Sequence, residues 1–139
     1  MKLDFTMIED VESFVSVPEG TYDCKVSEVR LGITRDGSPR WAMRLEVTDG
    51  EYAGRTAAWD ALVFSERGLP RVKLVLQCFG LDVTGTLEIE PNDLVGLHAR
   101  AQCMVEDYED RLTGRRLTRL RVPYMGYEQT NGNGNGNPH

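Results

Sequence analysis

The stretch RWAMRLEVT, from Arg40 to Thr48, is the strongest indication of how this chain folds. Its apolar residues, Trp41, Met43, Leu45 and Val47, fall on one face, and the other face carries Arg40, Ala42, Arg44 and Glu46. Such strict alternation is typical of a half-buried β-strand. The stretch therefore predicts a strand with one side in a core and a basic outer side.

A longer strand is predicted before it, over Thr21–Ile33. Its apolar positions change parity midway, from Tyr22, Cys24 and Val26 to Val29 and Leu31. A strand whose apolar parity changes needs a bulge or a strong bend, here near Ser27 and Glu28. The Arg35–Ser38 stretch then predicts a turn into the next strand.

Further elements follow downstream. A third strand is predicted from Arg55 to about Phe64. A helix is predicted over Ser65–Gly80, because apolar residues recur three and four positions apart at Leu69, Val72, Leu76 and Phe79. Pro91 to Leu94 predicts a short helical turn, and Gly96–Asp107 with Arg115–Met125 predicts a final hairpin.

Five strands with one helix between the third and the fourth is the layout of an oligonucleotide-binding (OB) barrel, a partly open Greek-key barrel. The predicted fold class is therefore all-β with one inserted helix, in a five-stranded OB-type barrel. Residues 18–127 are the predicted domain. Residues 1–17 are an acidic lead-in, in which Ile8, Val11 and Phe14 have helical spacing, and residues 128–139 are a disordered Asn-Gly tail.

Composition excludes several classes of protein. The net charge of -6 argues against a simple basic nucleic-acid binder, but residues 1–19 alone carry five acids against one Lys. No apolar run approaches the ~18 residues of a membrane span. Three scattered cysteines, Cys24, Cys78 and Cys103, indicate buried thiols in a reducing, cytoplasmic compartment. No histidine–cysteine spacing or catalytic motif is present, so we expect no metal, no cofactor and no enzymatic activity.

Single-strand binding requires cations for phosphates and flat rings for unpaired bases. The candidate nucleic-acid-binding residues are Arg30, Arg35, Arg40, Trp41, Arg44, Tyr52, Arg55, Trp59, Tyr108, Arg115, Arg119 and Arg121. Small Ala42, between Arg40 and Arg44, leaves room for a base in this interpretation. The alternative is that outer-face arginines are solvated or paired with Glu28, Glu46 or Asp60, as is usual on exposed strands.

The aromatic candidates differ in their patterns. Trp41 shares the parity of the apolar strand residues, which favours a place in the core or at its rim over a stacking platform. Trp59 cannot be assigned, because both parities are apolar around it. Tyr52 and Tyr108 are predicted in or beside loops, which favours stacking. The acidic run Glu106–Asp110 predicts a solvated hairpin tip rather than a metal site.

Several short motifs follow one another along the chain: Pro18-x-Gly20-x-Tyr22, Asp49-Gly50-x-Tyr52-x-Gly54-Arg55, Trp59-Asp60, Phe79-Gly80-Leu81, Leu94-Val95-Gly96, and Glu106 to Tyr108 with Gly114. Together they resemble a phage and prophage family of unknown function that is often described as single-stranded DNA-binding. The resemblance spans roughly residues 18 to 127. It implies an OB-type fold and a role in phage replication or recombination in the host cytoplasm. The Asn-Gly tail departs from the acidic tip by which many such proteins recruit partners.

We therefore expect a sequence-independent single-stranded DNA-binding protein. The alternative is an accessory module that uses its groove to bind a peptide or a partner subunit among replication or recombination proteins. A third hypothesis is a phage structural or assembly protein. The sequence leaves open the oligomeric state, including a homo-oligomer, and the preference between DNA and RNA.

Overall fold

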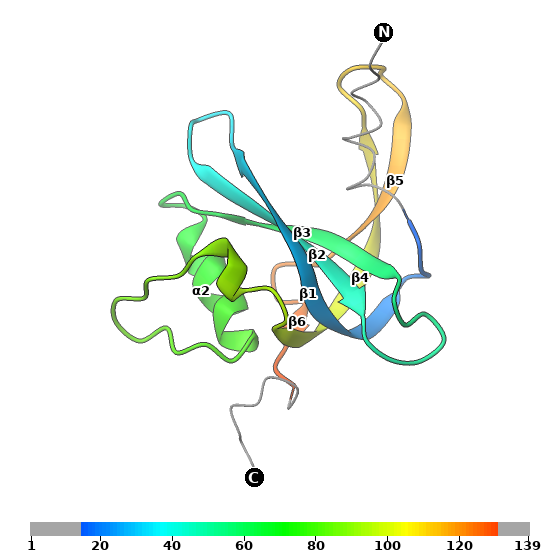
Figure 1. The fold of residues 1–139 in the computed structure, drawn as a ribbon. Helices are drawn as coiled ribbons and strands as arrows, with labels where there is room; N and C mark the ends of the chain where they lie inside the picture. Colours follow the sequence, from blue (N-terminus) through cyan, green and yellow to red (C-terminus); the bar gives the residue numbers. More distant parts are fainter. Residues whose placement is uncertain (1–14, 131–139) are drawn as a thin grey trace, which may run out of the picture.

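The computed structural model describes residues 15–130, which form an antiparallel sheet of six strands with one α-helix (Figure 1). The strands are β1 (Gly20–Ile33), β2 (Pro39–Val47), β3 (Thr56–Val63), β4 (His98–Glu109), β5 (Arg116–Arg121) and β6 (Tyr127–Glu128). Helix α2 (Leu69–Cys78) and the 3-10 turn η2 (Pro91–Asp93) lie between β3 and β4 in the chain. The helical turn predicted around Ile8 and the tail from residue 131 lie outside the described residues.

The sheet has the order β3-β2-β1-β4-β5, and β6 pairs with β4. Within residues 15–130 no ladder joins β3 to β5, so the sheet is open. The predicted count of five strands is wrong. The additional strand β6 is two residues long, with Tyr127 opposite Ala101, which is too short to show a periodicity in the sequence.

The bulge predicted in β1 is confirmed. The register of β1 against β2 shifts between Val26 and Glu28. The shift returns Val29 to the side of the sheet that Val26 occupies, and Val26 is fully buried. Because the bulge bends β1, residues 20–25 of this strand pair with β4 while residues 24–33 pair with β2.

The core lies on the inner side of the sheet and is completed by α2. The largest buried side chains are Phe79, Met43, Leu45, Leu62 and Leu94. The helix contributes Val72, Val75 and Leu76 from one stripe, as the apolar spacing predicts.

The position of the helix differs from the predicted Ser65–Gly80. It begins at Leu69 and ends at Cys78, because residues 65–68 form a tight turn instead. In that turn the Gly68 N–H donates to the Ser65 hydroxyl at 3.0 Å. A Cβ at Gly68 would lie 2.2 Å from the Val63 carbonyl oxygen, so the chain passes too close to β3 there for any side chain.

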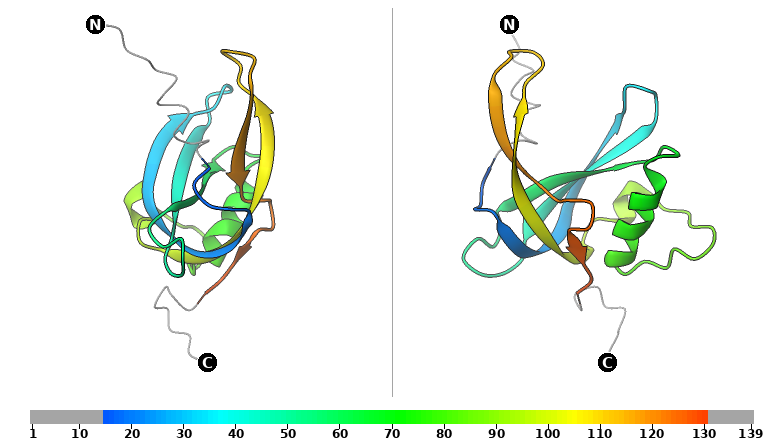
Figure 2. Two further views of the ribbon diagram at one scale, coloured as in Figure 1. Left: turned by 90° about the vertical axis from the view of Figure 1, so that its right-hand side faces the viewer. Right: turned by 180° about the vertical axis from the view of Figure 1, so that it is seen from behind.

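Two hairpin arms extend from the sheet and diverge from one another (Figures 1 and 2). One is the β1–β2 hairpin, with its turn at residues 34–38, and the other is the β4–β5 hairpin, with its turn at residues 110–115. No helix of the described residues is long and apolar enough to cross a membrane.

Candidate nucleic-acid interface

The outer side of β1, β2 and β3, opposite the core, brings several candidate residues together. Arg44 lies opposite Glu28 on β1 and Trp59 on β3. Ala42 lies opposite Arg30 and Ala61, and Arg40 opposite Gly32 and Val63. Residues opposite one another in an antiparallel sheet share a face. We call this surface the arginine face: Lys25, Glu28, Arg30, Arg40, Ala42, Arg44, Glu46, Trp59, Ala61 and Val63.

Trp59 lies on the arginine face but is not open to solvent. The Cζ atom of Arg30 lies 4.7 Å from the centroid of the Trp59 ring, and Trp59 is only 9% exposed. A cation above an aromatic face is attracted by its quadrupole. The ring therefore offers no free stacking surface while Arg30 holds this position.

Ala42 corrects another expectation. It is 1% exposed, so it provides no room for a base between Arg40 and Arg44. Its neighbours across the strands are Arg30 and Ala61, and the Arg30 side chain extends over this part of the face to Trp59. The small side chain of Ala42 therefore packs beneath the long side chain of Arg30.

Arg44 is fixed by a hydrogen-bond network that crosses three strands. Its Nε donates to Thr56 Oγ1 at 2.7 Å, and its Nη1 donates to Ser27 Oγ at 2.8 Å and to Glu46 Oε1 at 2.9 Å. Ser27 is the bulge residue of β1, so the network also holds the bend in that strand. This arrangement supports the structural alternative for Arg44 raised by the sequence.

The arginine face nevertheless carries more cations than anions. Arg30 pairs with Glu28 at 2.7 Å, and Glu46 serves both Arg44 and Lys25, at 2.9 and 3.8 Å. With Arg40, four basic side chains face two carboxylates. The Arg30–Glu28 pair is exposed, and such pairs contribute about 0–1 kcal/mol, so a phosphate competes with Glu28 at small cost. Among the residues of this face, basic side chains therefore outnumber carboxylates, although the chain as a whole is negative.

A second group of candidates meets on the outer side of β4 and β5. The Cζ atom of Arg119 lies 4.5 Å from the centroid of the Tyr108 ring. Glu106 accepts from Arg119 at 2.9 Å and lies 3.6 Å from Arg121. Tyr108 was expected in or beside a loop, but it lies within β4, which runs further than its sequence pattern predicts. Arg115 precedes β5 at the tip of the hairpin.

The acidic run from Glu106 is likewise not a hairpin tip. Four of its residues belong to β4, and Asp110 begins the turn, where its backbone N–H donates to the Arg115 carbonyl at 2.8 Å. Glu106 is instead the shared partner of the β5 arginines. Within residues 15–130 no group of acidic, histidine or cysteine side chains is placed to hold a metal ion.

Tyr52 and Arg55 lie away from the arginine face, in the β2–β3 loop. The Arg55 Cζ is 5.8 Å from the Tyr52 centroid, and Tyr52 meets Tyr22 edge-on at 6.1 Å. Arg55 does not open β3, which starts at Thr56, but donates from Nη1 to the Ser16 carbonyl at 3.3 Å. The adjoining hollow is lined by three carboxylates and one arginine: Asp23, Asp49, Glu51 and Arg100. This end of the molecule is unfavourable for a phosphate chain.

Two further candidates also lie off the arginine face. Trp41 is on the core side of β2, opposite Leu31 and Leu62, and its ring packs 4.6 Å from that of Phe64. This placement agrees with its apolar parity. Arg35 is exposed in the turn of the β1–β2 arm.

The three cysteines are free thiols. Cys24 and Cys103 are buried, and Cys78 is half-buried. Burial raises the pKa of Cys103 to about 12, and it raises the pKa of Cys24 further. Both remain protonated at neutral pH and fill the core as small apolar groups.

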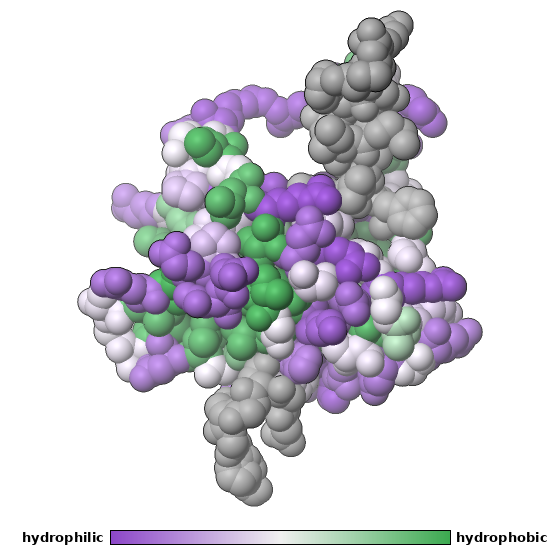
Figure 3. Space-filling view, viewed as in Figure 1, coloured by the Kyte–Doolittle hydropathy of each residue, from purple (hydrophilic) through white to green (hydrophobic). Residues whose placement is uncertain are grey.

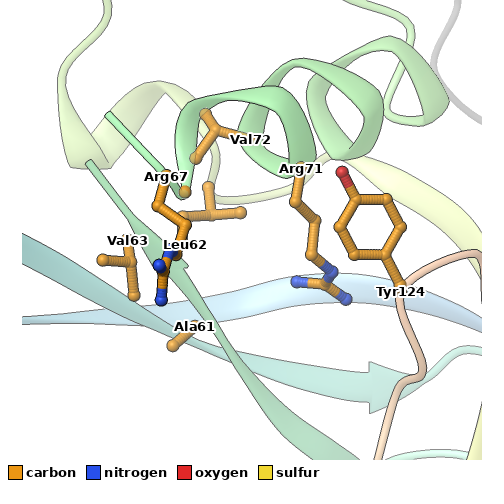
Figure 4. Close-up of a pocket in the computed structure, with 8 residues that line it drawn as sticks. Ala61, Leu62, Val63, Arg67, Arg71, Val72 and Tyr124 are labelled. Atoms are coloured by element: carbon orange, nitrogen blue, oxygen red, sulfur yellow. The ribbon is translucent and has the colours of Figure 1, made fainter. Parts of the chain in front are cut away.

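Sequence reasoning missed three polar residues that meet at the edge of β3. Arg67, Arg71 and Tyr124 line a pocket of about 210 Å³ together with apolar side chains of β3 and α2 (Figure 4). Arg67 and Arg71 are four residues apart at the start of the predicted helix, which was the one available signal. Tyr124 comes from a segment more than fifty residues away, and no local pattern connects it with them.

A family model described as protein of unknown function (DUF669) matches residues 5–79, more than half of the chain. The chain belongs to the DUF669 family. The matched DUF669 segment contains β1, β2, β3 and α2, and therefore the whole arginine face, Arg67 and Arg71. The β4–β5 arm, β6 and Tyr124 lie beyond it. No curated protein matches the chain.

Proposed function

We propose that this DUF669 protein binds single-stranded DNA through the arginine face, with little dependence on sequence. The observation that carries the proposal is the placement of Arg30, Arg40 and Arg44 on one continuous side of three neighbouring strands. Phosphate neutralisation supplies most of the affinity in sequence-independent binding. Arginine also presents a planar group that stacks on bases, which favours unpaired strands.

The sheet supports the same proposal by analogy. The order β3-β2-β1-β4-β5, with a bent β1 shared by two partners and a helix after β3, agrees with the connectivity of an OB fold. In OB folds the sheet face and two of the hairpin loops bind oligonucleotides. One fold can serve many functions, so we use the likeness to OB folds only to propose the class of ligand. The position of the binding site is proposed from the arginine face.

The ion pairs on this face set the expected affinity. Arg30 and Arg44 must exchange Glu28 and Glu46 for phosphate, and both carboxylates then remain nearby as like charges. Binding should therefore be modest and should weaken steeply with salt.

We propose a role in phage replication or recombination, in the cytoplasm of the host.

The test is fluorescence anisotropy of a labelled oligo-dT of about thirty nucleotides, longer than the about 4–16 nucleotides covered by one OB fold. The titration is run at two salt concentrations and with a duplex competitor. Binding that weakens with salt and resists the duplex supports the proposal. No binding at low salt overturns it.

A matched pair of variants locates the site. Arg40→Glu should weaken binding to all sequences alike. Arg116→Glu makes the same charge change on the β5 strand of the other arm, outside the arginine face, and should have a smaller effect. Equal effects would show that only net charge matters.

One observation favours a second function, a protein-interaction accessory. An apolar groove of about 320 Å³ lies between α2 and the segment after it, lined mainly by Phe64, Leu69, Leu76, Val83, Leu87 and Ile89. Figure 3 shows apolar side chains exposed among polar ones over this part of the molecule. A peptide or partner subunit held there would bind with little salt dependence, unlike DNA.

A further inference from the structure

The pocket at the edge of β3 is lined by apolar side chains and by three polar ones, Arg67, Arg71 and Tyr124 (Figure 4). Ala61, Leu62 and Val63 of β3 and Val72 of α2 supply the apolar part. In Figure 4 the side chains of Arg67 and Arg71 reach from the helix side toward β3, and the Tyr124 ring lies beside Arg71. The pocket is thus built from three separate segments of the chain.

Arg71 is a fixed wall of this pocket. Its Nη2 lies 3.1 Å from Asp60 Oδ2, and it also donates to the carbonyls of Val122 and Pro123 at 3.3 and 3.4 Å. Its Cζ lies 5.9 Å from the centroid of the Tyr124 ring. Arg71 therefore holds the segment before β6 against the helix and positions Tyr124.

Arg67 and Tyr124 are, by contrast, exposed at the surface of the pocket. The Arg67 side chain is exposed and makes no hydrogen bond or ion pair within residues 15–130. Tyr124 is 52% exposed, and no hydrogen bond of its hydroxyl occurs in the described part of the chain. An unpaired cation and an accessible aromatic ring are the two groups that single-strand binding requires.

The pocket is continuous with the arginine face. Ala61 and Val63 line the pocket and also lie opposite Ala42 and Arg40 on the arginine face. A strand that follows the arginines across β1 and β2 reaches the pocket when it crosses β3. In the other direction the hollow beside Arg67 is lined by the carboxylates of Asp36 and Glu66, which repel phosphates.

We propose that this pocket receives one unpaired nucleobase of the bound strand. Tyr124 stacks on the base, the β3 side chains contact its edge, and Arg67 neutralises the adjoining phosphate. The inference rests on the proposed function and adds a defined base site to a surface otherwise made of arginines. It also gives the preference for single strands a physical cause, because a base paired in a duplex cannot enter.

The size and chemistry of the pocket favour a base over a small-molecule ligand. Small-molecule sites usually measure about 300–1,000 Å³ and bury most of their ligand, whereas this pocket has about 210 Å³. Arg71, which is half-buried in the wall of the pocket, is already paired with Asp60. What remains is a shallow stacking site with a phosphate contact at its rim.

The experiment compares full-length wild type with Tyr124→Leu and Arg67→Gln, using the same labelled oligo-dT. Tyr124→Leu should lower affinity roughly fivefold or more at every salt concentration, since stacking is lost. Arg67→Gln should reduce the slope of log affinity against log salt by about 0.7, the value for one phosphate on a single strand. Arg111→Gln, at the tip of the β4–β5 arm, is the control for Arg67→Gln. It should leave the slope of log affinity against log salt unchanged.

Photocrosslinking provides a readout that does not depend on a variant. Wild type is irradiated with an oligonucleotide that carries 5-iodouracil, and the attached peptide is identified by mass spectrometry. Attachment at Tyr124 supports the pocket. The base site is refuted, and the proposed function is retained, if wild type binds the oligonucleotide but crosslinks at other residues and if Tyr124→Leu and Arg67→Gln bind as tightly as wild type. Wild type that binds no single strand overturns both.

Discussion

The guanidinium of Arg30 on β1 covers the indole ring of Trp59 on β3, with Cζ 4.7 Å from the ring centroid. These two residues are separated by the whole of β2, so their contact spans the width of the arginine face. Glu28 holds Arg30 in place through a 2.7 Å hydrogen bond. The contact makes Trp59 a reporter of what happens on this surface.

Arg30→Ala should expose Trp59 to solvent. In a Trp41→Phe background, which leaves Trp59 as the single tryptophan of the chain, acrylamide quenching should increase and emission should shift to the red. Arg35→Ala removes an arginine from the hairpin turn and should change neither. The loss of stability should be about 0.5–1 kcal/mol. Unchanged quenching would mean that other groups shield the ring.

Arg44→Ala should destabilise the protein by about 1–3 kcal/mol, because hydrogen bonds of a charged donor to Thr56, Ser27 and Glu46 are lost together. Urea unfolding measures the change. Arg67→Ala, which removes an arginine without such bonds, should leave the free energy of unfolding within about 0.5 kcal/mol. Similar values for the two variants would contradict the structural role given to Arg44.

Tyr127→Phe should also destabilise the fold. The Tyr127 hydroxyl donates to Asp60 Oδ2 at 2.7 Å, beside Arg71. Removing it leaves a shielded carboxylate with one partner fewer, at a cost of about 1–3 kcal/mol. Tyr124→Phe removes the hydroxyl of a residue that is 52% exposed, and it should be neutral. Equal thermal midpoints for the two variants would refute this expectation.

Stability should fall as the pH rises above about 9. Burial raises the pKa of Cys103 from 9.0 to about 12 in the folded protein. The unfolded thiol ionises first, so the stabilisation is complete below pH 9 and is lost as the pH rises toward 12. Urea unfolding of wild type and Cys103→Ala at several pH values isolates the contribution. A slope that is the same in both proteins would exclude Cys103 as its source.

Glu46→Gln should tighten binding to single-stranded DNA, if the arginine face is the site. The substitution removes a carboxylate that neutralises Arg44 and Lys25. It should raise affinity severalfold at low salt and steepen the salt dependence. Glu88→Gln makes the same change in the segment after α2 and should have a weaker effect. Weaker binding by Glu46→Gln would place the DNA elsewhere.

The sequence predicts those parts of the fold in which apolar and polar residues alternate regularly. The change of parity between Val26 and Val29 indicates the bulge, and the clean pattern around Met43 indicates the inner face of β2. Trp59 cannot be assigned to a face from the sequence, because the residues on both sides of β3 are apolar around it. In addition, the register between β2 and β3 shifts between Leu45 and Glu46, and Ala57 has no partner in this ladder. Residues 65–68 were assigned to the helix, since the closeness of Gly68 to β3 is a tertiary property.

The candidate site could be predicted only one strand at a time. The arginines of β1 and β2 were found because each lies on the outer parity of its own strand. The sequence pattern contains no information about which carboxylate pairs with which arginine, and so it gave no indication that Arg30 would cover Trp59. The pocket at Tyr124 depends on where the chain returns after β5, and this return follows from the packing of Arg71 against residues 122 and 123.

The sharing of β1 between two partners has a mechanical consequence. Among the described residues, each ladder that connects the two hairpin arms passes through this strand, which pairs with β4 at one end and with β2 at the other. A load that pulls the arms apart is therefore transmitted along the bent backbone at Ser27. A break in β1 would sever that connection. A break at residues 84–88 would instead leave the β1–β4 pairing itself intact.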